Sequence, residues 1–195
     1  MRHAHAHMYG LTGRPDRYEQ IARRPGRGLY GRIVADVAAA DLPPGARILD
    51  VGTGPGTVPL ALAAALPQVT LDGLDLAPTM VEHAAAAARA AGLTERVRFV
   101  AADGGDMPFP DDAFDLVVSS LSLHHWADAP AVVGEIGRVL RPGGVAWIYD
   151  VRPILGRAER AARRRWPAAA VHRAPVRTGR LPVRLFGRCT IRRPE

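Results

Sequence analysis

The sequence predicts an α/β fold built on a doubly wound, mostly parallel sheet. Short β-branched runs alternate with alanine-rich helical stretches between residues 47 and 150. Repeated strand, helix and strand units pair in parallel through right-handed crossovers, which places helices on both faces of the sheet. A glycine-rich loop joins the first strand of this alternation to its first helix, where open α/β sheets bind ligands. The 195 residues fit one domain of ordinary size.

The segment before the sheet, residues 16–45, is predicted to be helical and to act as a lid. Its β-branched residues have helical spacing, and the Pro-Pro-Gly run at 43–45 ends the pattern. Aromatic residues between positions 9 and 30 suit a cover over the strand ends. Residues 1–15 are predicted to be disordered.

The alternation itself, residues 46–151, contains five predicted strands and three predicted helices. The strands are expected at 47–51, 69–74, 96–101, 114–119 and 145–150, and the helices at 58–66, 78–91 and 130–140. Pro78 suits a first helical turn, where its missing N–H costs no hydrogen bond, and Gly92 follows the end of the same helix.

The last segment, residues 152–195, is predicted to close the domain. The expected elements are a helix at 155–166, an edge strand at 170–177 and a last strand at 183–192. Pro175 restricts its strand to an edge because it donates no backbone hydrogen bond. Arg184, Arg188 and Arg192 share one side of the last strand, so we expect that side to be solvated.

Charge is distributed unevenly along the chain. All 26 basic residues are arginine, and the net charge is +7. Residues 1–151 carry 13 Arg and 17 Asp or Glu, a net charge of −4, whereas residues 152–195 carry 13 Arg and 2 Glu, a net charge of +11. A basic segment of this kind binds phosphates in some proteins, but no aromatic-rich motif accompanies it here. Nucleic acid is therefore not the expected partner, and the arginines are expected on solvated faces.

Cysteine content and hydropathy indicate the compartment. The single Cys189 forms no intramolecular disulfide, and no pair of thiols exists to hold a structural zinc, which favours the reducing cytoplasm and predicts no metal site. No stretch of about 18 apolar residues and no secretory start are present, so neither a membrane span nor secretion is expected.

The glycine-rich loop at residues 48–56 reads Ile-Leu-Asp-Val-Gly-Thr-Gly-Pro-Gly. Its glycines allow a tight turn and let a ligand lie against bare backbone at the start of a helix. The fingerprint of nicotinamide enzymes requires a glycine where Thr57 stands, which weakens that interpretation. A triphosphatase loop requires lysine, which the chain lacks.

Three aspartates end successive predicted strands. Asp50 precedes the glycine turn, where a carboxylate disfavours a pyrophosphate but favours a cationic ligand. Asp75, at the end of the second strand, is placed to accept hydrogen bonds from both hydroxyls of a ribose. Asp103, at the end of the third, is placed to accept an amino N–H from adenine. Together they indicate a cationic adenosyl ligand.

In its glycine-rich loop and its three aspartates the sequence resembles the class I S-adenosylmethionine-dependent methyltransferases, particularly the small-molecule branch of ubiquinone and menaquinone biosynthesis. The resemblance covers residues 46–151, and the matching blocks are 49–56, 75–80, Asp103, 107–111, 114–120, His124-His125 and 140–144. It implies a Rossmann-like sheet of about seven strands with an antiparallel last strand. It also implies S-adenosylmethionine as the cosubstrate.

The resemblance carries cofactor contacts onto this chain. It implies that Gly52 and Gly54 pack against the methionine part, that Asp75 holds the ribose and that Leu76 borders the adenine. Asp103 and the Gly104 N–H would then contact the adenine edge, and Ser119 would lie beside the sulfonium. The complete predicted cofactor set is Asp50, Gly52, Thr53, Gly54, Gly56, Asp75, Leu76, Asp103, Gly104 and Ser119.

Methyl transfer from a sulfonium is a direct displacement at carbon, so alignment is the main task of the protein. A hydroxyl or amine acceptor also needs a base, and His124 and His125 follow the fourth strand on the ligand side. The Asn/Asp-Pro-Pro-Tyr motif of nucleic-acid methyltransferases is absent after that strand, where Ser-Ser-Leu-Ser stands. We therefore expect a small-molecule acceptor.

Two alternatives remain open at this point. One is a non-catalytic or regulatory protein with the same fold that binds anions or nucleic acid through its arginine-rich end. The other is a nicotinamide-dependent reductase. The sequence leaves open the identity of the acceptor, whether O, N or C is methylated, and whether the chain forms a homodimer.

Overall fold

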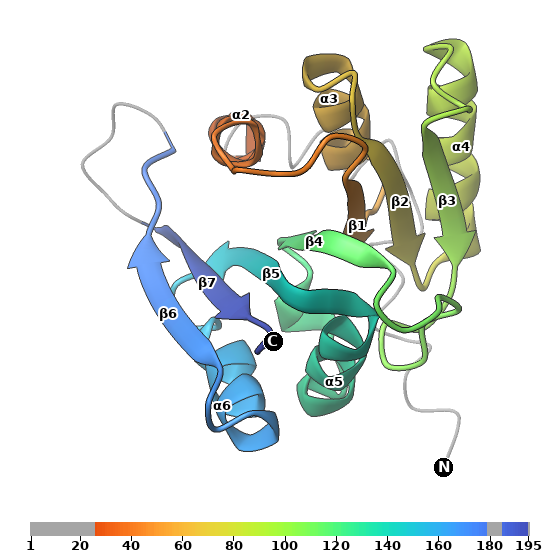
Figure 1. Ribbon diagram of the computed structural model, residues 1–195. Helices are drawn as coiled ribbons and strands as arrows, with labels where there is room; N and C mark the ends of the chain where they lie inside the picture. The colour runs from red at the N-terminus through yellow and green to blue at the C-terminus, as the bar shows by residue number, and fades with distance from the viewer. Residues whose placement is uncertain (1–25, 179–184, 195) are drawn as a thin grey trace.

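A computed structural model describes residues 26–178 and 185–194, which form one seven-stranded sheet with helices on both faces (Figure 1). The strands are β1 (Arg47–Val51), β2 (Thr70–Asp75), β3 (Val97–Ala101), β4 (Phe114–Ser120), β5 (Leu140–Val151), β6 (Ala170–Pro175) and β7 (Phe186–Arg192). Their order is β3-β2-β1-β4-β5-β7-β6. Strands β1 to β5 pair in parallel, and β7 is antiparallel to both of its neighbours. The predicted fold class is confirmed, including the antiparallel last strand.

The helices form two layers (Figure 1). They are α2 (Gly26–Ala38), α3 (Thr57–Ala65), α4 (Pro78–Ala90), the short 3-10 helix η2 (Leu123–His125), α5 (Ala129–Val139) and α6 (Gly156–Arg165). Helices α2, α3 and α4 cover one face of the sheet, and α5 and α6 cover the other. The Asp128 side chain accepts a hydrogen bond from the Ala131 N–H at 2.9 Å and caps α5.

The central strands are buried on both faces, which explains their continuous apolar runs. In β1, Ile48 packs into the core beneath α2 and α3, whereas Leu49 packs into the core beneath α5 and α6. In β4, Leu116 and Val117 divide between the two cores in the same way. Because successive side chains of a strand point to opposite faces, every second residue packs against the same layer of helices.

Helix α2 is part of the layer that covers the sheet. Leu29, Ile33 and Val37 are buried in the core that this helix shares with α3. Residues 1–25, which include the first part of the predicted lid, lie outside the described residues. The division of the chain into a lid, a cofactor-binding core and an arginine-rich closure therefore stays a prediction.

Strand β5 begins earlier than the sequence indicates. It starts at Leu140, which pairs with Phe114, and a register shift follows between Phe114 and Leu116. This irregularity carries the strand through the glycines at 143 and 144. The predicted edge strand is confirmed, since β6 lies at the border of the sheet and ends at Pro175.

The arginine side of β7 is not simply solvated, which corrects one expectation. The Arg188 side chain is 25% exposed, and its guanidinium lies 3.1 Å from a carboxylate oxygen of Asp36 in α2. It also lies over the ring of Trp147, 4.7 Å from the centroid. The Tyr149 hydroxyl donates to the same Asp36 oxygen at 2.9 Å. Arg188 is tolerated within the sheet because the Asp36 carboxylate of α2 pairs with it. Arg184 lies outside the described residues.

Candidate active site

A cavity of about 660 Å³ opens at the carboxyl ends of β1, β2, β3 and β4. Its walls come from the loops that follow these strands and from the beginning of α5. Seven of the twelve site residues predicted from the sequence line it: Gly52, Gly54, Asp75, Leu76, Asp103, Gly104 and His125. The topology thus brings residues more than 70 positions apart in sequence into one cavity.

The Asp75 carboxylate is fixed by the backbone of the cavity wall. One oxygen accepts the Gly54 N–H at 2.8 Å, and the other accepts the Ala77 N–H at 2.9 Å. A carboxylate oxygen accepts more than one hydrogen bond, so both retain capacity for hydroxyl donors. This geometry can bind a vicinal diol such as a ribose.

The glycines of the loop have different functions. Gly52 has φ +73°, and a Cβ there would lie 2.4 Å from the Cβ of Ser122, so only glycine fits. Gly54 has φ +53° and presents its N–H to Asp75. Gly56 lies away from the cavity lining. A Cβ at Gly56 would lie 2.8 Å from the Phe99 ring, so this glycine allows the start of α3 to pack closely.

Asp50 lies buried behind the glycine loop, with 1% of its surface exposed. Its Oδ2 accepts the Thr53 hydroxyl hydrogen bond at 2.8 Å, while Oδ1 has no hydrogen-bond partner among the described residues. Burial raises the pKa of Asp50 to about 7. Neither Asp50 nor Thr53 lines the cavity. A buried carboxylate oxygen without a donor fits a cationic ligand better than an anionic one.

The third aspartate and its neighbours form another wall. The Oδ1 of Asp103 accepts the Gly105 N–H at 2.8 Å, which fixes the turn after β3. Leu76 is 49% exposed and faces the same cavity. An apolar side chain opposite a carboxylate acceptor is compatible with an adenine ring.

Ser119 is fully buried and does not reach the cavity wall. Its Oγ lies 2.7 Å from the Oγ of Ser122, which donates to the Val51 carbonyl at 3.0 Å and accepts the Trp126 Nε1–H at 3.1 Å. Ser122 and Trp126 line the cavity instead. Leu121, with φ +54°, turns the chain so that Ser122 returns beneath Gly52. No sequence signal marks Ser122, because a serine after a strand resembles any turn residue.

The two histidines after β4 have different environments. The Nδ1 of His124 lies 3.0 Å from Asp150 Oδ2, and the Asp150 carboxylate is fully buried at the end of β5. This hydrogen bond raises the pKa of His124. His125 lines the cavity, and burial together with the neighbouring His124 lowers its pKa. The two ring centroids are 4.0 Å apart.

Two negative findings apply to residues 26–178 and 185–194. Within these ranges no group of three or more His, Cys, Asp or Glu side chains is arranged to hold a metal ion. In the same ranges no helix is both long and apolar enough to cross a bilayer.

Sequence comparison connects this geometry to a family. Residues 48–144 match the model of the methyltransferase domain. The demethylmenaquinone methyltransferase of Thermus thermophilus is 39% identical over 124 residues, which are 64% of this chain and 54% of that protein. The chain belongs to the class I S-adenosylmethionine-dependent methyltransferases. S-adenosylmethionine is the cosubstrate of this family.

Other relatives are named for the methylation of small molecules. The 27-O-demethylrifamycin SV methyltransferase of Amycolatopsis mediterranei is 40% identical over 100 residues, 51% of this chain and 36% of that protein. The chain spans about half the length of the curated relatives it matches. Among solved structures, a SAM-dependent methyltransferase from Aquifex aeolicus aligns with a TM-score of 0.73 and 18% identity over 92% of this chain and 98% of that chain. The [4+2]-cyclase SpnF aligns with a TM-score of 0.69 and 23% identity over 84% and 81%. These structural matches show the fold alone.

Proposed function

We propose that this methyltransferase transfers the methyl group of S-adenosylmethionine to a small-molecule acceptor by direct displacement. The observation that carries the proposal is the meeting of the glycine loop, Asp75 and Asp103 around one cavity at the strand ends. The relatives support a small acceptor, because they are named for quinone and antibiotic substrates. A nicotinamide reductase is disfavoured by the acid before the turn and by Thr57.

The residues present fit the cosubstrate. In this proposal Asp75 holds the ribose hydroxyls, and the backbone of Gly52 and Gly54 contacts the methionine part. Asp103 and Gly104 contact the adenine edge, while Asp50 supplies negative charge behind the loop. The bound cosubstrate supplies a methyl group on a positively charged sulfur, which makes the methyl carbon electrophilic.

His124 is proposed as the general base for a hydroxyl or amine acceptor. Because Nδ1 faces the Asp150 carboxylate, Nδ1 carries the proton and Nε2 is left to accept one. Asp150 then stabilises the imidazolium that forms and keeps the ring oriented. His125 and Trp126, in the cavity wall, are proposed to exclude water from the acceptor.

The compartment of the enzyme is inferred from its cysteine content. We place it in the cytoplasm on the basis of its single buried cysteine, Cys189. A homodimer is compatible with the sequence.

Replacement of Asp75 tests the proposal directly. The Asp75→Ala variant should bind S-adenosylmethionine at least about tenfold more weakly in calorimetry, because both charge-assisted ribose hydrogen bonds are lost. Asp72→Ala is a matched control on the same strand, since Asp72 pairs with Arg47 and is not part of the cavity lining. Equal affinities of the Asp75→Ala and Asp72→Ala variants would contradict the assignment, as would no binding by the wild type.

A further inference from the structure

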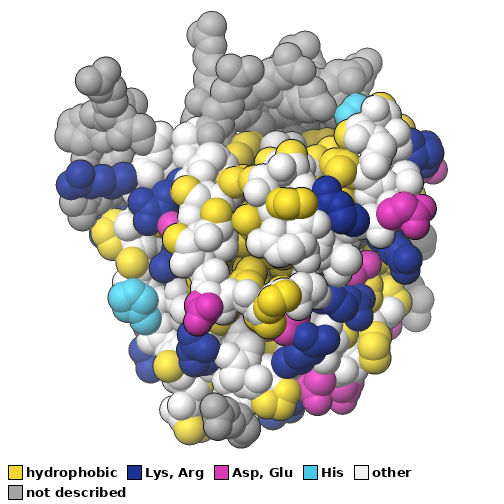
Figure 2. All heavy atoms as spheres, turned by 45° about the horizontal axis from the view of Figure 1, so that its top comes forward, with side chains coloured by type: hydrophobic (Ala, Val, Ile, Leu, Met, Phe, Trp, Pro, Cys, Tyr) yellow, Lys and Arg dark blue, Asp and Glu magenta, His cyan; other side chains and the backbone are white. Residues whose placement is uncertain are grey.

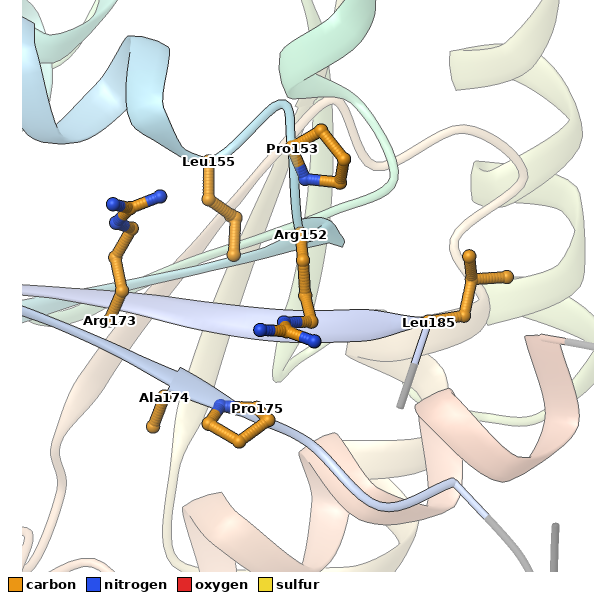
Figure 3. A pocket seen from close by; sticks show the side chains of 7 residues that line it. All are labelled: Arg152, Pro153, Leu155, Arg173, Ala174, Pro175 and Leu185. Carbon is orange, nitrogen blue, oxygen red and sulfur yellow. The ribbon is translucent and has the colours of Figure 1, made fainter. Parts of the chain in front are cut away.

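A second cavity lies at the same edge of the sheet. Its volume is about 640 Å³, and it lies between the ends of β5, β6 and β7 and the loop before α6 (Figure 3). Strand β5 ends just before Arg152, β6 ends at Pro175 and β7 begins at Phe186. Because β6 runs parallel to β5, all three positions are on the carboxyl edge, where the first cavity also opens. We call this the Arg152 cavity.

Arg152 supplies a positive charge to this cavity. Its side chain is exposed and has no hydrogen bond or ion pair to the rest of the described chain. In Figure 3 it extends across β7 toward Pro175. The second arginine of the lining, Arg173, is paired with Glu159 at 2.6 Å. A guanidinium of this kind binds a carboxylate or phosphate through paired hydrogen bonds.

The remaining lining is apolar. Leu155, Pro153 and Leu185 border the cavity, and Leu185 is 53% exposed. Gly187 provides the space, because a Cβ there would lie 2.9 Å from Leu155 Cδ1 and 3.2 Å from Arg152 Cγ. The cavity therefore suits a molecule with an apolar body and one anionic group.

The position of the Arg152 cavity relates it to the reaction site. Arg152 follows Asp150 by two residues, and the Asp150 carboxylate holds His124. Strand β4 borders the first cavity, and β7 lies in the middle of the second. The two strands are two strand spacings apart, which is roughly 10 Å. A molecule bound in both cavities therefore spans at least about that distance.

We propose that the Arg152 cavity binds the anionic end of the methyl acceptor, a carboxylate or phosphate carried on an extended apolar body. The nucleophile at the other end of the acceptor then lies at His124. This inference rests on the proposed function and adds the chemical class of the substrate.

The test uses three probes of equal chain length, 8-hydroxyoctanoate, 8-hydroxyoctyl phosphate and the neutral 1,8-octanediol. They are titrated calorimetrically into the full chain in the presence of S-adenosylhomocysteine. We expect at least one anionic probe to bind about tenfold or more tightly than the diol. Arg152→Gln should abolish this preference, whereas Arg164→Gln, an exposed arginine of α6 outside the cavity lining, should preserve it.

A second measurement connects the cavity to the reaction site. The ring signals of His124 in NMR spectra, assigned with a His124→Gln variant, should shift with the tighter anionic probe. If S-adenosylhomocysteine still binds, two results would overturn this inference and leave the proposed function intact. One is equal binding of the three probes, and the other is unchanged binding of the probes by Arg152→Gln. Binding that depends on Arg152 without any shift at His124 would show a separate anion site and overturn the acceptor assignment. Failure of the wild type to bind S-adenosylhomocysteine would overturn the proposed function and this inference with it.

Discussion

At the scale of single residues, the environment of each acid determines its chemistry more than its place in the sequence. Asp75 and Asp103 are exposed to the cavity and held by backbone N–H groups, whereas Asp50 is buried with one oxygen unpaired. Burial opposes ionisation of Asp50, and a cation placed nearby favours it. Cofactor binding and the protonation of this residue should therefore be linked.

The pH dependence of cofactor affinity follows from this linkage. The pKa of Asp50 is raised to about 7, so its carboxyl group is mostly neutral at pH 6 and mostly ionised at pH 8. Wild-type protein should therefore bind S-adenosylmethionine more tightly at pH 8 than at pH 6, by about tenfold at most. Asp50→Asn should bind weakly and equally at both values in calorimetry. A wild-type affinity that falls as the pH rises would contradict this role.

The histidine pair gives a second prediction at this scale. Asp150 raises the pKa of His124, so Asp150→Asn should lower it, and the neutral imidazole should then persist to lower pH. NMR titration of the ring signals measures this shift. The ring of His125 is followed in the same spectra, because burial lowers its pKa while Asp150 contributes in the opposite direction. Unchanged titration of His124 in Asp150→Asn would show that the pair does not function as a unit.

At the scale of secondary-structure elements, the alternation of strands and helices specified nearly the whole sheet. Strand β1 begins and ends where the sequence predicts, because a short β-branched run between turn residues has few other solutions. The predicted start of β5 was wrong, because the neighbouring strand β4 and not local turn chemistry determines the pairing of Leu140 with Phe114. Ser119 was expected at the cavity, but the left-handed turn at Leu121 puts Ser122 there. Such corrections depend on tertiary contacts, which residue patterns do not contain.

The contact between α2 and β7 is the element-scale prediction. Asp36 accepts from both Tyr149 and Arg188, and its removal deprives two largely buried donors of their carboxylate acceptor. Asp36→Ala should lower the free energy of unfolding by about 2 to 3 kcal/mol in urea titrations. Arg32→Ala removes only the exposed ion pair between Arg32 and Asp36 and should lower the free energy of unfolding by about 0.5 kcal/mol or less. Equal losses for the two variants would show that the contact is not a buried network.

At the scale of the whole molecule, the arginine-rich end and the acidic body compensate each other. Arg188 pairs with Asp36 and Arg193 pairs with Asp112, so ion pairs join the two segments whose net charges are opposite. Figure 2 shows arginine and acidic side chains interspersed on one face of the molecule. That face therefore has no continuous basic surface, which disfavours the alternative that the protein binds nucleic acid or another polyanion there.

The family features of the sequence and the geometry of the cavity lead to one central claim, that the cavity at the strand ends binds S-adenosylmethionine. The most direct measurement is a crystal structure with S-adenosylhomocysteine. Our account predicts that both ribose hydroxyls lie within hydrogen-bond distance of Asp75 and that the adenine lies between Leu76 and Asp103. Binding of the ligand elsewhere, or in this cavity with its ribose away from Asp75, would contradict the account.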